Sequence, residues 1–555
     1  MSTRMYRQIL LVTLAISVLV TGLPGGTQKQ EVKRKHVAAA EKLAGLKLDK
    51  AERDSLLEEV NLNLASYRRL RELELPNSVP PALAFNPVPV GFTFDVDQRE
   101  IVYSPVGEVV RPENLEELAF YSVAQLAELV RTRQVTSTEL TKLFLERLKR
   151  YDSQLHCVVT LTEELALEQA ARADEEIAAG NYHGPLHGIP YGAKDLLAAK
   201  DYKTTWGAGP YKEQVIDEDA AVVQRLEEAG AVLVAKLTLG ALAWGDVWYG
   251  GKTRNPWNTE QGSSGSSAGP GSATSAGLVP FAIGSETWGS IVSPSTRNGV
   301  TGLRPTFGRV SRAGAMALSW SMDKLGPMTR SVEDCAIVFD AIRGPDGVDQ
   351  TVVDLPFNYN YQVDLSALRI GYVASAFEEE RNNQANDQAV LDVLRSLGAN
   401  LVPMELPEYP VSDMSFILSA EAAAAFDELT LTGRDDLLVR QVKNAWPNNF
   451  RSSRFIPAVE YIQANRARYA LIQQMAAKFE EVDLYVAPAF VGDNLLLTNL
   501  SGHPCVVLPN GFNEEGSPTS ITFMGQIYDE GTILAVARAF QEATDWHRQH
   551  PPGFE

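Results

Sequence analysis

Cysteine is scarce in this sequence, with three residues among 555. Cys157, Cys335 and Cys505 are odd in number and lie far apart, which suits neither a disulfide framework nor a cysteine zinc site. We expect all three to be buried as small apolar side chains. The shortage of cysteine therefore excludes a fold that depends on disulfide bonds.

Positive charge is also in short supply. The chain has 50 Lys and Arg residues against 70 Asp and Glu residues, which gives a formal net charge of −20 and a pI of about 5.0. Because binding to phosphate backbones requires a basic surface, this balance disfavours DNA or RNA as a partner.

Apolar residues from Ile9 to Val20 form a run that is shorter than the roughly 20 residues needed to span a bilayer. Arg4 and Arg7 precede the run, and glycine and proline follow it. This order is typical of a secretory signal, so we predict a signal peptide over residues 1–26 and a secreted or periplasmic protein. No A-x-A cleavage site follows the run, which leaves an uncleaved membrane anchor, with the folded part outside the cytoplasm, as the alternative.

The rest of the chain has globular composition, with 45% hydrophobic and 22% charged residues. Residues 27–117 form a predicted N-terminal extension. Leu56, Val60 and Leu64 recur at helical spacing, which predicts a helix or helical hairpin, and a proline-rich extended segment follows between Pro76 and Pro89. The extension is interpreted either as a partner-binding or membrane-facing helix pair, or as a segment packed on the main domain.

From about residue 118 the pattern alternates between helix and strand. Thr136 and Glu139 form a capping box that begins an amphipathic helix. Strands are predicted over residues 156–162 and 231–237, with a helix over residues 163–179. Because the strand at 231–237 is apolar without alternation, we expect an α/β fold whose sheet is covered by helices on both faces.

Three short patterns resemble cofactor or metal sites but depart from them. The stretch from Gly245 to Thr253 has one residue too many for a phosphate-binding loop, and Gly269–Gly271 lacks the third glycine of a dinucleotide site. His183 and His187 have the spacing of helical metal ligands, but glycine and proline lie between them and no third ligand is evident. We therefore predict no cofactor and no metal.

A serine- and glycine-rich stretch runs from residue 262 to residue 299. A flexible linker of this composition has few large apolar residues, whereas Leu278–Ile283 and Ile291–Val292 are apolar here. These side chains favour burial, so the serines are expected to be packed within the fold.

Motifs in and around this stretch strongly resemble the amidase signature family. They are Gly184–Pro190, Ala193–Asp195, Gly265–Ser267, Gly277–Pro280, Gly284–Ile291, Gly302–Ser311, Asp483–Pro488, Asn499–Pro504 and Ile521–Gly525. Their order matches that of the family, and the resemblance assigns residues 118–548 to an amidase domain. The fold that it implies has a large mixed β-sheet covered by helices.

The resemblance also implies a function, the hydrolysis of a carboxamide to a carboxylate and ammonia or an amine through a serine acyl-enzyme. It implies Ser290 as the nucleophile, Ser266 as a bridging serine in a cis peptide and Lys194 as the general base, with backbone N–H groups of Thr287, Trp288 and Gly289 facing the oxyanion. A small-molecule amide is the expected partner, and the family uses no metal or organic cofactor. Trp288 stands where the family usually has glycine. Either its ring narrows the acyl pocket, or its backbone shifts the N–H donors, or the ring packs into the domain without affecting turnover.

A lysine can accept a proton from serine only when it is neutral. Since free lysine titrates near ~10.4, work near neutral pH requires a downward pKa shift of about 3 units, or roughly 4 kcal/mol. Burial of Lys194 beside hydroxyl groups would produce this shift. The side chain of Asp195 is therefore expected to point away from Lys194.

Three alternatives remain open in the sequence. A Ser-His-Asp hydrolase requires a G-x-S-x-G turn, which Ser290 lacks, and His503 is its best histidine. The second is the A subunit of the amidotransferase that makes glutaminyl-tRNA, a member of the same family. The third is a noncatalytic secreted binding protein on an amidase scaffold.

Overall fold

The computed structural model describes residues 31–73 and 75–555, so the predicted signal peptide lies outside the described residues. The chain divides into two compact units, residues 1–74 and 75–555. The division falls inside the predicted extension of residues 27–117. Its proline-rich part, from residue 75 onward, therefore belongs to the larger unit.

The described part of the smaller unit, residues 31–73, contains three helices, α1 (Arg34–Ala44), α2 (Lys50–Ser55) and α3 (Leu57–Leu70), in agreement with the predicted helix or helical hairpin. The Asn61 carboxamide of α3 accepts hydrogen bonds of 2.9 Å from the N–H groups of Glu31 and Val32. In the described part of the chain, none of the helices has both the length and the apolar character needed to cross a membrane.

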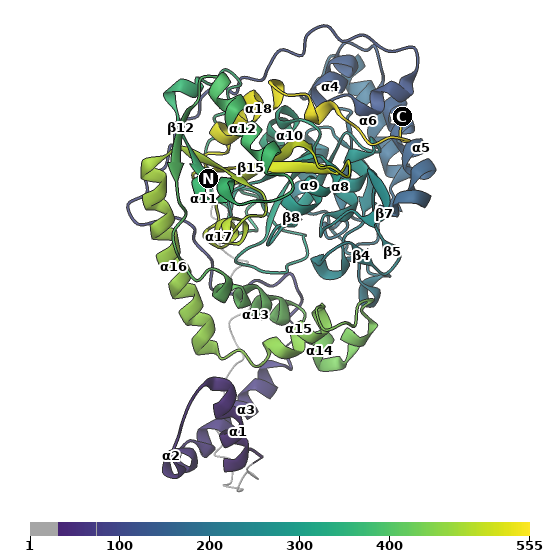
Figure 1. The fold of residues 1–555 in the computed structure, drawn as a ribbon. Helices are drawn as coiled ribbons and strands as arrows, with labels where there is room; N and C mark the ends of the chain where they lie inside the picture. Colours follow the sequence, from purple (N-terminus) through teal and green to yellow (C-terminus); the bar gives the residue numbers. More distant parts are fainter. Residues whose placement is uncertain (1–30, 74) are drawn as a thin grey trace, which may run out of the picture. The chain divides into compact units, whose positions relative to one another are not determined.

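The larger unit is built on a sheet of 11 strands, drawn from blue through teal and green to yellow in Figure 1. In spatial order the strands are β1 (Val158–Leu161), β3 (Val232–Leu237), β2 (Pro190–Lys194), β8 (Phe281–Glu286), β10 (Lys324–Thr329), β9 (Thr301–Arg304), β14 (Cys505–Phe512), β15 (Pro518–Gly525), β13 (Leu484–Pro488), β11 (Arg369–Val373) and β12 (Asn400–Met404). Strand β2 runs parallel to β3 and β8, whereas β8 and β10 are antiparallel, so the sheet is mixed as expected.

Helices cover both faces of the sheet. Successive strand residues point to opposite faces, and in β14 Val506 packs in the same core cluster as Leu534 of α18, whereas Val507 packs with Leu497 of α17. The helices of the larger unit are α4 (Val123–Arg131), α5 (Ser137–Leu155), α6 (Glu163–Ala178), α7 (Ala221–Glu228), α8 (Ala268–Ser275), α9 (Val292–Asn298), α10 (Val332–Ile342), α11 (Ala374–Glu378), α12 (Gln384–Ser396), α13 (Phe416–Ala425), α14 (Asp427–Thr432), α15 (Trp446–Ser453), α16 (Ala458–Glu481), α17 (Asn494–Ser501) and α18 (Glu530–Glu542). The predicted α/β architecture is confirmed.

Smaller elements complete this unit. The two short hairpins are β4 (Val247–Trp248) with β5 (Gly251–Lys252), and β6 (Arg254–Asn255) with β7 (Asn258–Gly262). The 3-10 helices are η1 (Leu115–Phe120), η2 (Gly209–Tyr211), η3 (Ala241–Ala243), η4 (Leu365–Ala367), η5 (Ser412–Met414), η6 (Arg434–Leu437) and η7 (Trp546–Arg548).

Local predictions are confirmed with small shifts. Thr136 and Glu139 form the predicted capping box at α5, with reciprocal bonds of 3.0 and 2.9 Å. The predicted strand at 156–162 shortens to β1 because His156, at φ 49°, ends α5 in a left-handed conformation. Cys157, Cys335 and Cys505 are buried and free, as expected.

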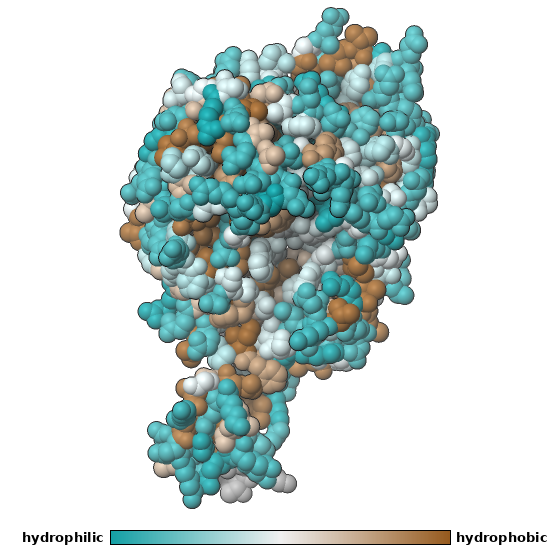
Figure 2. All heavy atoms as spheres, viewed as in Figure 1, coloured by the Kyte–Doolittle hydropathy of each residue, from teal (hydrophilic) through white to brown (hydrophobic). Residues whose placement is uncertain are grey.

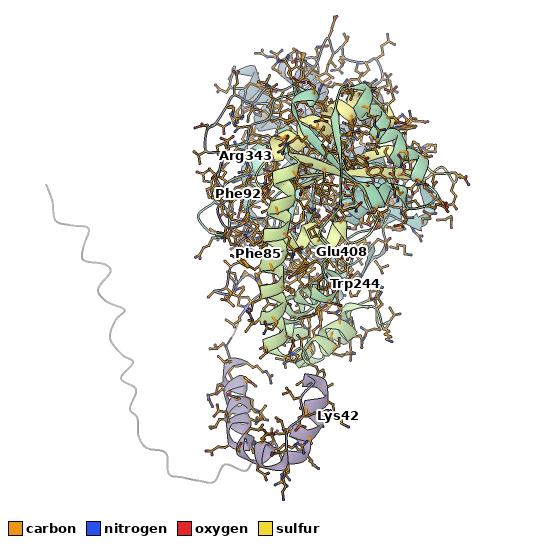
Figure 3. All side chains as sticks on the ribbon, turned by 60° about the vertical axis from the view of Figure 1, so that its left-hand side comes forward. Lys42, Phe85, Phe92, Trp244, Arg343 and Glu408 are labelled. Atoms are coloured by element: carbon orange, nitrogen blue, oxygen red, sulfur yellow. The ribbon has the colours of Figure 1, made fainter. Side chains whose placement is uncertain are left out.

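Residues 75–114 cross the larger unit without helix or strand. The Phe85 ring lies edge-on to Phe307 at 5.0 Å, and the Arg468 guanidinium of α16 lies 3.5 Å above it. Figure 3 shows Phe85 beside this long helix. The proline-rich segment is thus packed on the main domain, and the face drawn in Figure 2 is covered mostly by hydrophilic residues.

Candidate functional site

Lys194 is the last residue of β2, and its side chain is fully buried. Its Nζ atom lies 2.8 Å from the Oγ atom of Ser266, 3.0 Å from that of Ser267 and 2.8 Å from that of Ser285. Among the described residues, no carboxylate hydrogen bonds to this amine. Lys194 is therefore surrounded by neutral hydroxyl groups.

This environment controls the protonation of Lys194. Burial lowers the pKa of its amine well below the ordinary value of 10.5, because the charged form loses its hydration. Asp323 and Glu286 raise this pKa through their charges, but less strongly than burial lowers it. The geometry therefore favours a neutral amine, which can accept a proton.

The neighbouring carboxylate faces elsewhere, as expected. Asp195 forms a buried ion pair with Lys236, with 2.9 Å between Oδ1 and Nζ. The other oxygen of Asp195 accepts hydrogen bonds from the backbone and hydroxyl of Thr205. Its charge is therefore compensated without Lys194.

The serine-rich loop brings two further predicted residues to Lys194. Ser266 follows a cis peptide bond from Gly265, as the family resemblance implies. A Cβ atom at Gly265 would lie 1.9 Å from the carbonyl oxygen of Gly245, so only glycine allows this approach. The N–H group of Ser267 donates a 3.2 Å hydrogen bond to the carbonyl oxygen of Ser290. Lys194, Ser266 and Ser290 are thus gathered in one place.

Ser290 lies in the turn between β8 and α9 and is half-buried. Gly289 adopts φ +84°, a conformation that a side chain would disfavour. Within the described chain, no residue accepts a hydrogen bond from the backbone N–H groups of residues 287–290. These donors are free to bind an anion. Trp288 is 44% exposed, so its ring is only partly packed against the domain.

A buried ion pair holds this turn. Glu286 and Arg304 are both fully buried and lie 2.9 Å apart. Burial alone would raise the pKa of Glu286, but Arg304 and several hydrogen bonds outweigh it and lower the pKa to about 2. The same carboxylate accepts hydrogen bonds of 2.8 and 2.9 Å from the N–H groups of Ile291 and Val292. Glu286 therefore fixes the backbone on the C-terminal side of Ser290.

Two more groups at the site were missed in the sequence. Ser285 binds Lys194 directly, and the Asp323 carboxylate accepts a hydrogen bond from the Thr287 hydroxyl. Glu286 had a detectable signal, since it and Arg297 are the charged residues of the stretch 262–299. Ser285 had none, because nothing in the sequence distinguishes it from its neighbouring serines.

The histidine alternative does not fit this geometry. His503 is buried, its ring stacks on Phe479 at 4.9 Å, and its Nδ1 atom lies 2.8 Å from the hydroxyl of Ser501. Burial lowers its pKa to about 3. No histidine of the described residues hydrogen bonds to Ser266 or Ser290, so the serine that the motifs select has no imidazole base.

His183 and His187 do come together with a third group, Glu176. The Nδ1 atom of His187 accepts a hydrogen bond from the His183 N–H, at 3.1 Å. Nε2 of His187 therefore carries the ring proton, and it lies 3.1 Å from the carboxylate of Glu176. A metal at Nε2 would need to displace this proton and leave an imidazolate, which makes the cluster a poor metal site.

A cavity of about 690 Å³ opens at the site, and Ser285 and Thr287 are among its lining residues. This volume lies within the range of roughly 300–1,000 Å³ that is usual for small-molecule pockets. Further walls come from the loop between β9 and β10, from the proline-rich segment of residues 77–84, and from residues 218–224 and 346–351.

Comparison with known sequences places this site in a family context. The family model for amidases matches residues 139–497 of this chain. The A subunit of the glutamyl-tRNA(Gln) amidotransferase from Methylococcus capsulatus is 34% identical over 480 residues, which covers 78% of this chain and 99% of that protein. Its counterpart from Moorella thermoacetica is 33% identical, with the same coverage.

Solved structures show the same similarity. Native peptide amidase from Stenotrophomonas maltophilia superposes with a TM-score of 0.71 at 30% identity, over 79% of this chain and 100% of that chain. An amidase family protein from Bacillus anthracis also reaches a TM-score of 0.71, at 25% identity, over 79% of this chain and 93% of that chain.

Proposed function

Because this chain belongs to the amidase signature family and is an amidohydrolase, we propose that it hydrolyses a small-molecule carboxamide through an acyl-enzyme on Ser290. The products are a carboxylate and ammonia or an amine. The observation that carries the proposal is the contact between Lys194 and Ser266, in which a buried amine with a lowered pKa lies 2.8 Å from a serine hydroxyl.

In the acylation step, the Oγ atom of Ser290 attacks the carbonyl carbon of the amide. Its proton passes to Ser266, whose own proton passes to the Nζ atom of Lys194. Lys194 can accept it because burial disfavours the charged amine in the resting enzyme, while the hydroxyls of Ser267 and Ser285 solvate the ammonium once it has formed.

The carbonyl oxygen gains negative charge as Ser290 attacks. We assign the N–H groups of Thr287, Trp288 and Gly289 to this oxyanion, because they have no hydrogen-bond acceptor among the described residues. The Glu286–Arg304 ion pair holds the turn in place, so these donors do not need to rearrange during the reaction. Preorganised donors of this kind contribute about 2.7–4 kcal/mol each.

Collapse of the tetrahedral intermediate breaks the C–N bond. The leaving nitrogen takes the proton back from Lys194 through Ser266 and departs as ammonia or an amine. A water molecule then attacks the Ser290 ester, and its proton passes through Ser266 to Lys194. When the ester C–O bond breaks, this proton returns through Ser266 to the Oγ atom of Ser290, and the acid is released and ionises to the carboxylate. The cycle leaves Lys194 neutral and Ser290 free.

The test is hydrolysis of a panel of aliphatic, aryl, peptide C-terminal and long-chain amides by the purified protein. At least one should yield acid and amine in equal amounts. The Ser290→Ala protein should lose at least about 10⁴-fold in kcat/KM, as expected for a nucleophile. Hydrolysis that survives in Ser290→Ala would contradict the acyl-enzyme.

A glutaminase role is the second candidate, because the curated relatives are amidotransferase A subunits at 30–34% identity. In that role the enzyme would release ammonia from glutamine. Glutamine hydrolysis by the isolated chain that exceeds all other amides in kcat/KM would favour it. The noncatalytic binding protein is set aside, since the chain is an amidohydrolase.

A further inference from the structure

The cavity beside Ser285 and Thr287 has one wall that comes from outside the family match. Residues 77–84, which we call the strap, precede the matched residues 139–497 and line this cavity. Asn77 anchors the strap. Its Nδ2 atom donates to the carbonyl oxygen of Ala317 at 2.8 Å, and its Oδ1 atom accepts from the N–H of the same residue at 2.7 Å.

Hydrogen bonds connect the loop that binds Asn77 to the turn of residues 287–290. Immediately after Ala317, the N–H groups of Leu318 and Ser319 donate to Asp323 at 2.7 and 2.9 Å. The other oxygen of Asp323 accepts the hydroxyl of Thr287. The strap and the turn that carries Ser290 are therefore both hydrogen bonded to the loop between β9 and β10.

Part of the cavity wall is apolar. Pro80, Ala82 and Leu83 line it from the strap, and Met316 and Leu318 line it from the loop. Proline restricts the backbone of the strap, so this wall keeps its shape without regular secondary structure. Such a lining favours an apolar group over a hydrated one.

The charges around the cavity are mostly negative. Carboxylates that line it are Glu218, Asp219, Asp323, Asp346 and Asp349. Arg312, the cation among the described lining residues, is already bound to Asp349, Thr351 and the carbonyl oxygen of Trp320. Burial would raise the pKa of Asp349, but Arg312 outweighs it and lowers the pKa to about 2, so this carboxylate is ionised at neutral pH. An anionic group in the cavity would meet repulsion and no free cation.

We propose that the strap is a specificity-determining wall of the active site, and that it selects amides with a long, uncharged apolar substituent over short or anionic ones. This inference rests on the proposed hydrolysis at Ser290, because the cavity matters only if the reacting amide lies beside Thr287. It also disfavours glutamine, whose α-carboxylate would find no free cation among the described lining residues.

The test compares kcat/KM for acetyl, butyryl, hexanoyl and octanoyl p-nitroanilides, and for N-alkyl acetamides of the same chain lengths, so that both sides of the amide are probed. Ala82→Trp fills the cavity from an exposed position, and Asn77→Ala removes both anchor bonds. Asn86→Ala is the matched control, because this exposed side chain on the same segment binds only the nearby N–H of Val88, at 3.0 Å.

In one of the two series, the wild-type enzyme should have its highest kcat/KM for the substrate with the eight-carbon chain. The same substrate with a carboxylate at the end of that chain should have a kcat/KM at least about tenfold lower. Ala82→Trp and Asn77→Ala should lower the octyl-to-short ratio by about tenfold or more, as expected when a well-packed contact is lost. Asn86→Ala should keep the ratio. Ratios that do not respond to either strap variant would overturn the inference.

Labelling separates the failure of this inference from that of the proposed function. Ethyl and octyl fluorophosphonates should both modify Ser290. The octyl compound should label wild type faster than the ethyl compound does, and the two rates should be similar in Ala82→Trp. Labelling of Ser290 with no chain-length preference would overturn the role of the strap alone. No labelling by either compound would overturn the proposed function, and the inference with it.

Discussion

The Nζ atom of Lys194 lies 2.8 Å from the Oγ atom of Ser266, in a site where no described carboxylate hydrogen bonds to the amine. Lysine paired with a carboxylate would remain charged and could not take a proton. The separation of Lys194 from Asp195, which pairs with Lys236 instead, is therefore as important to the proposed chemistry as the contact with Ser266.

Ser290 should be the single site of covalent modification. An aryl fluorophosphonate should add one adduct to the intact protein, and peptide mapping should assign it to Ser290, because this serine lies beside free backbone donors and the Lys194–Ser266 pair. Ser290→Ala should abolish the adduct. Labelling that survives in Ser290→Ala but disappears in His503→Ala would support the histidine mechanism instead.

Loss of the Glu286 charge should damage both stability and rate. Glu286→Gln leaves Arg304 buried without its partner, which should cost about 3–5 kcal/mol in the free energy of unfolding. The Ile291 and Val292 N–H groups also lose a charged acceptor, so kcat should fall. Chemical denaturation and steady-state kinetics measure the two effects.

A matched variant separates them. Glu530→Gln breaks another fully buried pair, with Arg309, that does not contact the serine turn. It should destabilise the protein to a similar degree and leave kcat of the folded enzyme near wild type. Equal losses of kcat in both variants would contradict a positioning role for Glu286.

The same pair predicts a pH dependence of stability. The folded-state pKa of Glu286 is lowered to about 2, below the value near ~4.3 expected in the unfolded chain. Its contribution is therefore complete above the unfolded value and is lost as pH falls toward 2. Denaturation curves measured across this range should show a shallower pH dependence in Glu286→Gln than in wild type. Identical slopes would contradict this assignment.

Trp288 should restrict bulky substrates and leave the chemistry intact. Its exposed ring lies on the turn beside Ser290, while its N–H group is retained in Trp288→Ala. The ratio of kcat/KM for a pivaloyl amide to that for an acetyl amide should rise, with a stability change within about 0.5 kcal/mol. Trp546→Ala, which removes another partly exposed ring, serves as control. An unchanged ratio in Trp288→Ala would show that the ring lies away from the approaching amide.

Export is proposed for the full-length chain. The basic and apolar segments at Arg4–Val20 predict that expression in a Gram-negative host yields a periplasmic protein shortened by roughly 22–28 residues. N-terminal sequencing of the periplasmic fraction checks this. A chain that begins at Met1 in the membrane fraction would support the anchor, and a full-length cytosolic product would contradict both.

Much of the fold was accessible from sequence because its determinants are local. The capping box at Thr136, the helix after residue 163 and the apolar strand β3 each depend on neighbouring residues, and the family motifs added the mixed sheet and the serine site. Those motifs also marked the loop whose Ser266 binds Lys194.

The groups missed in the sequence depend on long-range contacts. Ser285 reaches Lys194 because β8 lies beside β2 in the sheet. Glu286, at the end of β8, pairs with Arg304 of β9, which lies two strands away in the same sheet. The proline pattern of residues 76–89 predicts an extended segment, but it does not reveal which surface the segment crosses. Its place beside the cavity depends on tertiary contacts, such as the bonds of Asn77 to Ala317.

The proton acceptor is the central claim, and the profile of kcat/KM against pH for wild type, Lys194→Ala and Lys194→Arg tests it most directly. Burial lowers the pKa of Lys194, and the neutral form is the active one, so wild-type activity should rise with pH through a group that titrates well below 10.5. Both variants should lose at least about 10³-fold, because alanine has no base and the arginine guanidinium stays protonated. Near-normal amide turnover in Lys194→Arg, with the same pH profile as wild type, would contradict the account.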